Sequence, residues 1–143
     1  MKIGDLAKAA TCSTETIRFY EREGLLPAPD RSDSNYRTYR AEHVERLRFI
    51  RNCRKLDMAH DEIRSLLSYI DQPHDNCGPV NHLLDEHIVH VDVRIAELQR
   101  LRGQLLRLRE QCASAQPVED CGILNGLAAM ETEEKLPSAS HLG

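Results

Sequence analysis

Five cysteines are the residues of this 143-residue chain whose type and spacing could do chemistry. We expect Cys77, Cys112 and Cys121 to bind a metal ion as thiolates. Three sulfur ligands with no obvious histidine or carboxylate partner favour soft ions such as lead, mercury or cadmium, whereas structural zinc usually takes four ligands. We interpret Cys12 and Cys53 as small buried hydrophobic residues, the commoner role of an isolated cysteine.

The spacing of the three thiols determines how they can meet. Cys112 follows Cys77 by 35 residues, which in a continuous helix is roughly 50 Å, so the two cannot share an ion within one chain. In an antiparallel pair of helices, Cys77 of one chain would lie beside Cys112 and Cys121 of the other, and two identical sites would form. The eight residues between Cys112 and Cys121 are enough to fold both sulfurs onto one centre.

The long helix that this arrangement requires is predicted from about Pro79 to Gln111. Pro79 suits a first helical turn, and no other predicted segment is long enough to cover the apolar seam of this helix, so we expect a homodimer held by a two-stranded coiled coil. His87 and His90 lie too far from Cys77 to be obvious ligands to the same ion, and we interpret them as solvated or supporting groups, with a second metal site as the alternative. The seam recurs at steps of three or four: Leu84, Ile88, Val91, Ile95, Leu98, Leu101, Leu105 and Leu108.

The N-terminal half has a different pattern, two short helices joined by a tight turn. Apolar spacing predicts a helix over 3–10, Ser13 can cap a second over 14–23, and Gly24 is placed to end it, which together form a helix-turn-helix. Residues 30–40 alternate tyrosine and arginine among turn formers, which indicates a small hairpin, or wing, with a solvated charged loop as the alternative. Further helices are predicted at about 41–54 and 60–69.

Charge is concentrated in one segment of the chain. The net charge is −4, yet residues 31–55 carry eight basic and three acidic side chains, the local footprint that DNA binding requires. No signal peptide and no apolar run of about 18 residues is evident, so we expect a cytoplasmic protein that does not enter a membrane. This length allows one modest core rather than a large enzyme cleft, and we predict no enzymatic activity.

These elements predict a mainly α-helical chain in four parts. Residues 1–75 would form a winged helix-turn-helix DNA-binding domain, and residues 76–112 a long antiparallel dimerisation helix. Residues 113–130 would form a metal-binding loop and a short apolar helix. Residues 131–143 would be a disordered polar tail.

Three motifs resemble the DNA-binding signature of the MerR family of metal-responsive transcription regulators. They are Ile3-Gly4-Asp5-Leu6-Ala7-Lys8, Thr16-Ile17-Arg18-Phe19-Tyr20-Glu21-Arg22-Glu23-Gly24-Leu25-Leu26 and Asn35-Tyr36-Arg37-Thr38-Tyr39. Further segments are similar to the lead- and cadmium-responsive branch: 51–54, 56–58, 61–67, Cys77-Gly78, 85–88, Cys112 and Cys121-Gly122-Ile123-Leu124. The resemblance covers the chain from Lys2 to about Leu127.

The resemblance implies a homodimer on a dyad-symmetric promoter, where metal binding distorts the DNA so that RNA polymerase can read it. Cys77, Cys112 and Cys121 would be the metal ligands, with lead(II) as the first candidate ion and cadmium(II), mercury(II) or zinc(II) as the others. The residues that we expect to contact DNA are Thr14, Thr16, Arg18, Tyr20, Arg31, Tyr36, Arg37 and Arg54.

Two departures from the branch bear on the choice of ion. Ala113 follows Cys112 where zinc-sensing relatives have a second cysteine, and the tail holds only His141 where some cadmium-responsive relatives are rich in histidine, which favours lead. A mercury- or zinc-responsive regulator of the same family remains an alternative. A cysteine-based metal buffer or chaperone would have no use for the basic wing, and a thiol redox enzyme is disfavoured because no Cys-x-x-Cys pair exists.

Overall fold

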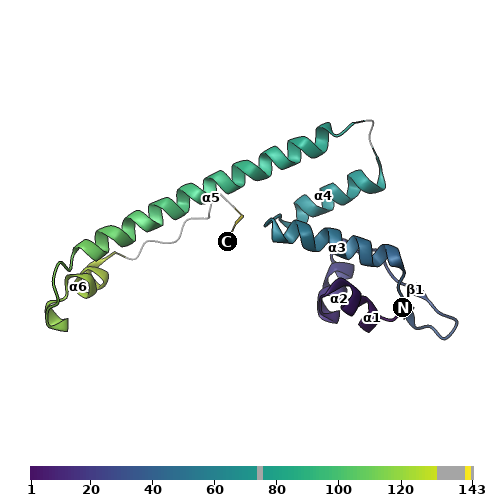
Figure 1. Ribbon diagram of the computed structural model, residues 1–143, viewed down its shortest axis with the longest axis horizontal. Helices are drawn as coiled ribbons and strands as arrows, with labels where there is room; N and C mark the ends of the chain where they lie inside the picture. Colours follow the sequence, from purple (N-terminus) through teal and green to yellow (C-terminus); the bar gives the residue numbers. More distant parts are fainter. Residues whose placement is uncertain (74–75, 132–140, 143) are drawn as a thin grey trace. The chain divides into compact units, whose positions relative to one another are not determined.

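The computed structural model of the chain describes residues 1–73, 76–131 and 141–142. They belong to two compact units, Met1–Leu83 and Leu84–Gly143. The first unit holds the predicted helix-turn-helix, wing and following helices, and most of one long helix lies in the second (Figure 1). The mainly α-helical fold class predicted from the sequence is confirmed.

The helix-turn-helix consists of α1 (Ile3–Ala10) and α2 (Thr14–Arg22). Between them Thr11 has a positive φ of 55°, which turns the chain after α1. Ser13 caps α2 as predicted, because its Oγ accepts a hydrogen bond from the backbone N–H of Thr16 at 3.1 Å. Gly24 follows the end of α2 at φ 72°, a conformation that glycine adopts without a steric penalty.

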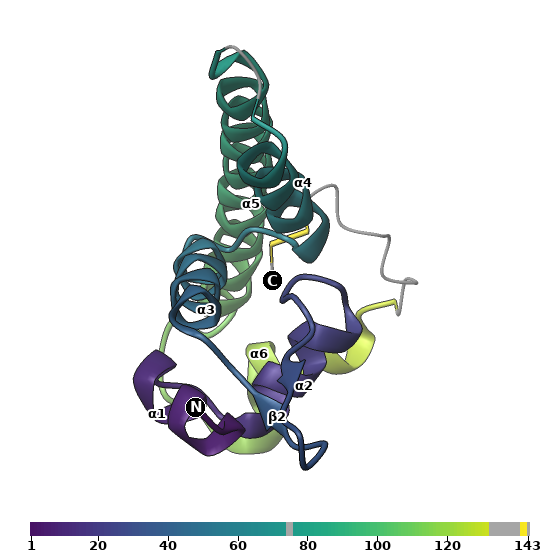
Figure 2. The same ribbon diagram turned by 90° about the vertical axis from the view of Figure 1, so that its right-hand side faces the viewer.

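The predicted wing is a short antiparallel hairpin of β1 (Asp30–Arg31) and β2 (Arg37–Thr38), with Asp30 opposite Thr38. Its turn projects from the first unit (Figures 1 and 2). The chain start holds the end of β2, since the backbone N–H of Tyr39 donates to the Met1 carbonyl and the Met1 amino group donates to the Tyr39 carbonyl, both at 2.8 Å.

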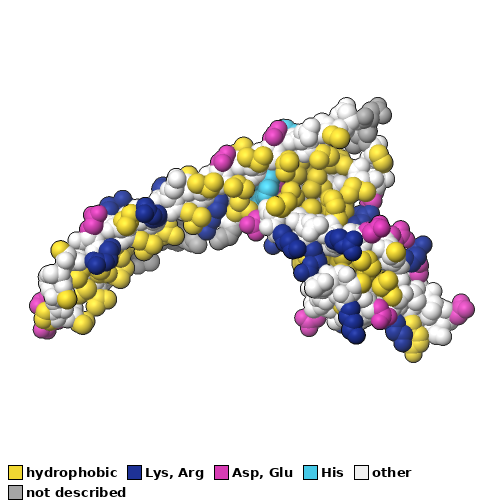
Figure 3. Space-filling view, viewed as in Figure 1, with side chains coloured by type: hydrophobic (Ala, Val, Ile, Leu, Met, Phe, Trp, Pro, Cys, Tyr) yellow, Lys and Arg dark blue, Asp and Glu magenta, His cyan; other side chains and the backbone are white. Residues whose placement is uncertain are grey.

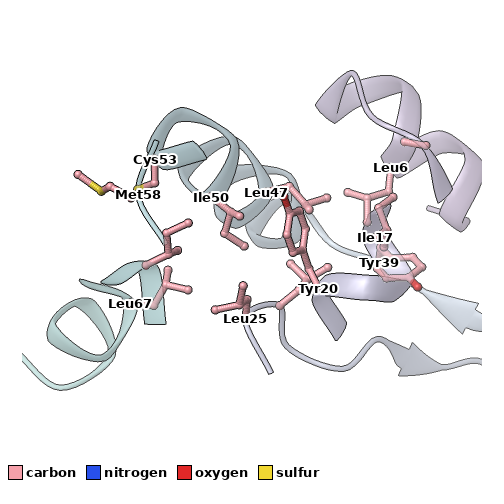
Figure 4. Packing of buried hydrophobic residues seen from close by; sticks show 13 residues of the cluster. Leu6, Ile17, Tyr20, Leu25, Tyr39, Leu47, Ile50, Cys53, Met58 and Leu67 are labelled. Carbon is pink, nitrogen blue, oxygen red and sulfur yellow. The ribbon is translucent and has the colours of Figure 1, made fainter. Parts of the chain in front are cut away.

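The core of the first unit joins the helix-turn-helix to α3 (Ala41–Lys55) and α4 (His60–Asp71). Figure 4 shows Leu6, Ile17, Leu47 and Ile50 turned toward one another, and all four side chains are fully buried. Burial of each such side chain stabilises the fold by about 1.5–3 kcal/mol. Cys53 is also buried and Cys12 packs against the same cluster, so the interpretation of these two cysteines as hydrophobic residues is confirmed.

The long helix α5 (Gly78–Glu110) has 33 residues and begins one residue before the predicted Pro79. Apolar side chains along it stay exposed, among them Leu98 at 46% and Leu105 at 58% (Figure 3). A 3-10 turn, η1 (Val118–Asp120), and an eight-residue helix, α6 (Gly122–Ala129), follow. The sequence predicted a loop and a short helix within residues 113–130.

None of the helices in the described ranges has the length and hydropathy needed to cross a membrane. The predicted disordered tail, residues 131–143, falls mainly on residues 132–140 and 143, which lie outside the described residues.

Candidate metal centre and DNA interface

Two of the three predicted metal ligands meet in the second unit. Cys112 follows the end of α5, and Cys121 is the residue from which α6 begins. The Cys112 thiol lies close enough to Cys121 to lower the pKa of its thiol, and it donates a hydrogen bond to the Ser114 carbonyl oxygen at 3.4 Å. The loop between the two cysteines therefore brings them close together.

The surroundings of Cys121 favour the thiolate, the form that binds metal. The backbone N–H of Leu124 is the largest cause that lowers the pKa of Cys121. Burial, the next largest, opposes it, and the N–H of Ile123 and the Cys112 thiol lower the pKa further. Both N–H groups belong to the first turn of α6, which has no intrahelical acceptor for them. The N–H groups at the start of α6 thus favour the thiolate form of Cys121.

Gly122 allows α6 to approach α5 this closely. A Cβ atom at this position would overlap the carbonyl oxygen of Gln111 and would lie 3.0 Å from its carbonyl carbon. Both are backbone atoms, so no side-chain rotation could make room. Sequence reasoning did not assign Gly122 a role, although its place directly after a ligand cysteine was the available signal.

Cys77 is exposed and directly precedes α5. The 33 residues of α5 separate it from Cys112 by roughly 50 Å along the helix axis. One chain therefore brings together Cys112 and Cys121 but not Cys77. The predicted set of three sulfurs would therefore require a second chain.

The predicted DNA contacts on α2 divide into accessible and inaccessible groups. Arg18 is exposed, whereas Thr14 and Thr16 are half-buried, and the Thr16 hydroxyl lies 2.8 Å from that of Ser13. Tyr20 is only 7% exposed and belongs to the core. This burial does not favour the predicted contact of Tyr20 with DNA, which stays a prediction.

The wing residues predicted to contact DNA are exposed to solvent, and contacts with α2 hold the wing in place. Tyr36 is 71% exposed at the turn of the hairpin. Glu21 on α2 accepts a hydrogen bond from the Tyr39 hydroxyl at 2.5 Å and pairs with Arg37 at 3.2 Å. Burial, followed by the adjacent Glu21 carboxylate, raises the pKa of Tyr39 to about 12, which keeps the hydroxyl a donor. Arg31 donates to the Asn35 carbonyl at 3.2 Å across the turn.

A basic surface on α3 was not predicted from the sequence, which indicated only the general basic charge of residues 31–55. Arg48, Arg51 and Lys55, with Asn52, face the end of α1 across an open cleft of about 360 Å³. The Arg51 guanidinium donates to the carbonyl of Thr11, next to the start of α2. The spacing of these residues at three and four positions was the signal for a shared face. The predicted Arg54 lies nearby in sequence and donates to the Met58 carbonyl at 2.6 Å, bracing the turn before α4.

Comparison with known proteins shows the family of the chain. Two family models match: the MerR helix-turn-helix family regulatory protein over residues 1–70 and the MerR DNA-binding model over residues 44–108. The transcriptional regulator ZntR homolog of Haemophilus influenzae is 49% identical over 114 residues, covering 80% of this chain and 84% of the relative. ZntR of Escherichia coli is 37% identical over 128 residues, covering 88% and 91%.

Solved structures show the same fold. The transcription regulator PbrR691 of Ralstonia metallidurans, in complex with lead(II), is 51% identical with a TM-score of 0.80, covering 89% of this chain and 98% of that one. MerR of Bacillus megaterium, in complex with mercury(II), is 29% identical with a TM-score of 0.70, covering 90% and 99%. Such proteins are transcription regulators and not enzymes. The chain belongs to the MerR family of helix-turn-helix regulators.

Proposed function

We propose that this protein is a cytoplasmic, homodimeric regulator that binds promoter DNA and activates metal-resistance genes when Cys77, Cys112 and Cys121 bind a soft divalent ion. The observation that carries the proposal is the pairing of Cys112 with Cys121 beside the first turn of α6. Two neighbouring thiols, one with a lowered pKa, need little reorganisation to become two thiolate ligands.

The third ligand is Cys77 of a second chain. The apolar seam along α5 supports this, because Leu84, Ile95 and Leu101 remain 44%, 48% and 49% exposed in the single chain. A second copy packed antiparallel on that face would bury them and place its own Cys77 beside Cys112 and Cys121. Each dimer would then have two identical sites.

The ion that fits best is lead(II), followed by cadmium(II). Three sulfur ligands match the preference of soft ions, and the relative that is 51% identical was solved with lead(II). Mercury(II) is the main competitor, since a relative that is 29% identical was solved with mercury(II).

The DNA-binding surface proposed here is centred on α2 and the wing. Arg18 is placed to contact base edges or phosphates, with Thr14 and Thr16 beside it, and Arg31, Tyr36 and Arg37 to contact the backbone from the wing. Arg51 and Lys55 extend the surface with phosphate contacts, next to Arg54.

The switch that we propose links the metal centre to the shape of the DNA. The bound ion supplies bonds between the two subunits at each end of the helical pair. Cys77 belongs to the unit that carries the helix-turn-helix, so holding its sulfur in place also restrains the DNA-binding head. Bending and untwisting a promoter costs a few kcal/mol, which a difference in metal affinity between two protein states can supply, and RNA polymerase would then read the distorted promoter.

A heterodimer experiment tests the shared site. Cys77→Ser and Cys112→Ser chains carrying different affinity tags are refolded together, and the heterodimer is isolated through both tags. Lead(II) titration, followed by thiolate-to-lead absorption, should show two ions per wild-type dimer, one per heterodimer and none bound tightly by either homodimer. A heterodimer that binds no better than the homodimers would contradict the shared site.

The response itself is tested by transcription in vitro from the cognate promoter with lead(II), cadmium(II), mercury(II) and zinc(II). Lead(II) should activate at the lowest concentration. Cys77→Ser should bind the operator as wild type but fail to activate, and loss of operator binding in that variant would point to a structural role for Cys77 instead.

A further inference from the structure

The charged side chains of α5 are divided between its two halves. Residues 84–93 contain three acidic side chains and no lysine or arginine, whereas residues 94–110 contain five arginines and two acidic side chains. With histidines neutral, the first half has a formal charge of −3 and the second half a formal charge of +3. Basic side chains lie among the apolar ones on the half of α5 that leads to α6 (Figure 3). Two copies of α5 are therefore complementary in charge only when they run in opposite directions.

One acidic and one basic side chain lie directly beside the apolar seam. Asp85 follows Leu84 and Arg102 follows Leu101, and both seam leucines are exposed, at 44% and 49%. Each helical residue is turned by about 100° from the one before it, so Asp85 and Arg102 lie on the same side of the seam. Both are exposed, and neither forms an ion pair with another residue in the part of the chain that the structure describes.

The arginine nearest the middle of α5 has its partner within the chain. Arg94 pairs with Glu97 one turn further on, at 3.3 Å, and the two side chains are only 31% and 16% exposed. This pair has no net charge and favours neither direction of a second helix. The direction thus depends on the charges nearer the two ends of α5.

The register of the proposed metal site brings Asp85 and Arg102 of different chains together, so this step rests on the proposed function. When Cys77 of one antiparallel helix lies opposite Cys112 of the other, Asp85 lies opposite Gln104. Arg102 is two residues from Gln104, an offset of about 3 Å along the axis that an arginine side chain can span. Twofold symmetry keeps residues from the same side of the seam on the same side of the pair, and it produces the contact twice.

We propose that Asp85 of each subunit pairs with Arg102 of the partner subunit, and that these two pairs specify antiparallel association with a second copy of this chain. An apolar seam alone can pack in either direction, whereas charges that flank a seam determine orientation and partner choice. A parallel pair would place Asp85 beside Asp85 and Arg102 beside Arg102. It would also hold Cys77 roughly 50 Å from the other two cysteines, so the charges protect the metal site from being divided.

The test reverses the charges in the full-length protein and measures the dimer dissociation constant by analytical ultracentrifugation at low salt. Asp85→Arg and Arg102→Asp should each weaken the dimer roughly tenfold, because each places like charges together twice per dimer. The chain that carries both substitutions should return to within about threefold of wild type, since opposite charges meet again. At about 1 M salt these differences should largely disappear.

The chain that carries both substitutions also separates pairing between subunits from an effect within one helix. Acidic side chains near the start of a helix and basic ones near its end stabilise that helix by themselves. On that account this chain would form the weakest dimer of the three variants. In a parallel dimer the reversals would leave like charges facing like and would restore nothing, so recovery in this chain supports antiparallel pairing.

A mixture of the two single variants gives a second readout. The heterodimer of Asp85→Arg with Arg102→Asp has opposite charges at both contacts, so native mass spectrometry should show it in excess over both homodimers. Arg107→Asp is the matched control, because Arg107 lies opposite His82 in this register, and we expect a dissociation constant within about threefold of wild type. Circular dichroism verifies that each variant keeps its helix.

Two results would overturn the proposal, and they can be told apart. If the chain with both substitutions stays as weak as the single variants while wild type dimerises and binds lead(II), the charge pairing is wrong and the proposed function stands. If wild type stays monomeric at micromolar concentration, the shared metal site of the proposed function fails as well.

Discussion

Gly122 offers the sharpest test of the cysteine geometry, through the substitution Gly122→Ala. The added Cβ would overlap the backbone carbonyl of Gln111, and the start of α6 must move by about 1 Å to relieve the overlap. Cys121 lies directly before this position, so the shift takes its sulfur away from Cys112 and removes the backbone N–H groups that lower its pKa. The metal-free protein can tolerate this movement because the loop is on the surface.

The expected loss of lead(II) affinity follows from the cost of moving Cys121 back to Cys112. Drawing Cys121 back to Cys112 restores the overlap, and overpacking of this kind costs about 1–3 kcal/mol. Lead(II) affinity should therefore fall roughly 5- to 150-fold. The assay is competition for lead(II) against a chelator of known affinity, with the thermal unfolding midpoint and operator affinity measured on the same samples.

Gly126→Ala is the matched control in the same helix. Its Cβ would meet the terminal oxygen of the Gln111 side chain, which is flexible and can rotate away. We expect lead(II) affinity within about twofold of wild type for this variant. The reasoning is refuted if Gly122→Ala binds lead(II) as tightly as wild type, or if both variants lose affinity equally.

Three further predictions concern the first unit. Arg18→Ala should weaken operator binding by about 1–3 kcal/mol, measured by fluorescence anisotropy, with lead(II) affinity unchanged. Arg51→Ala and Lys55→Ala should each lower the slope of operator affinity against salt by about one, and an unchanged slope would remove α3 from the interface. The raised pKa of Tyr39 stabilises the fold below its ordinary pKa of 10.0, and this contribution is lost as pH rises toward about 12. Urea unfolding should therefore show that the free energy of unfolding of wild type falls by about 2–3 kcal/mol more than that of Tyr39→Phe over that pH range. Parallel plots of unfolding free energy against pH for the two proteins would contradict the Glu21 contact.

The sequence was sufficient wherever a local rule decided the structure. The two ends of α2 could be predicted from Ser13 and Gly24, because helix capping and a left-handed backbone each depend on a single residue. The apolar period of α5 predicted a long helix. The spacing of Cys112 and Cys121 allowed the prediction that they meet, because eight intervening residues are enough to bring both sulfurs together.

Tertiary packing decided the features that the sequence could not supply. Tyr20 is of a residue type that often contacts DNA, but its side chain lies in the core. Residue type alone could not distinguish the buried face of α2 from the face toward solvent. His87 is buried rather than solvated and its ring stacks on that of His141, with centroids 5.3 Å apart, although no periodic pattern connects two residues so distant in sequence. The short helix predicted within residues 113–130 is α6, but its bounds could not be predicted because eight residues are too few for a clear helical period.

The division of ligands between the ends of α5 has a consequence for how sensing and DNA binding are coupled. Cys77 lies in the unit Met1–Leu83 with the helix-turn-helix, whereas Cys112 and Cys121 lie in the unit Leu84–Gly143. In the proposed dimer, each site therefore joins the head of one subunit to the sensor loop of the other. A variant that lengthens the segment between Cys77 and the head should keep metal affinity but lose activation, because the sulfur would still reach its partners while the head would be free to move. If such a variant still activated fully, the restraint on the head could not be the means by which metal binding alters the promoter.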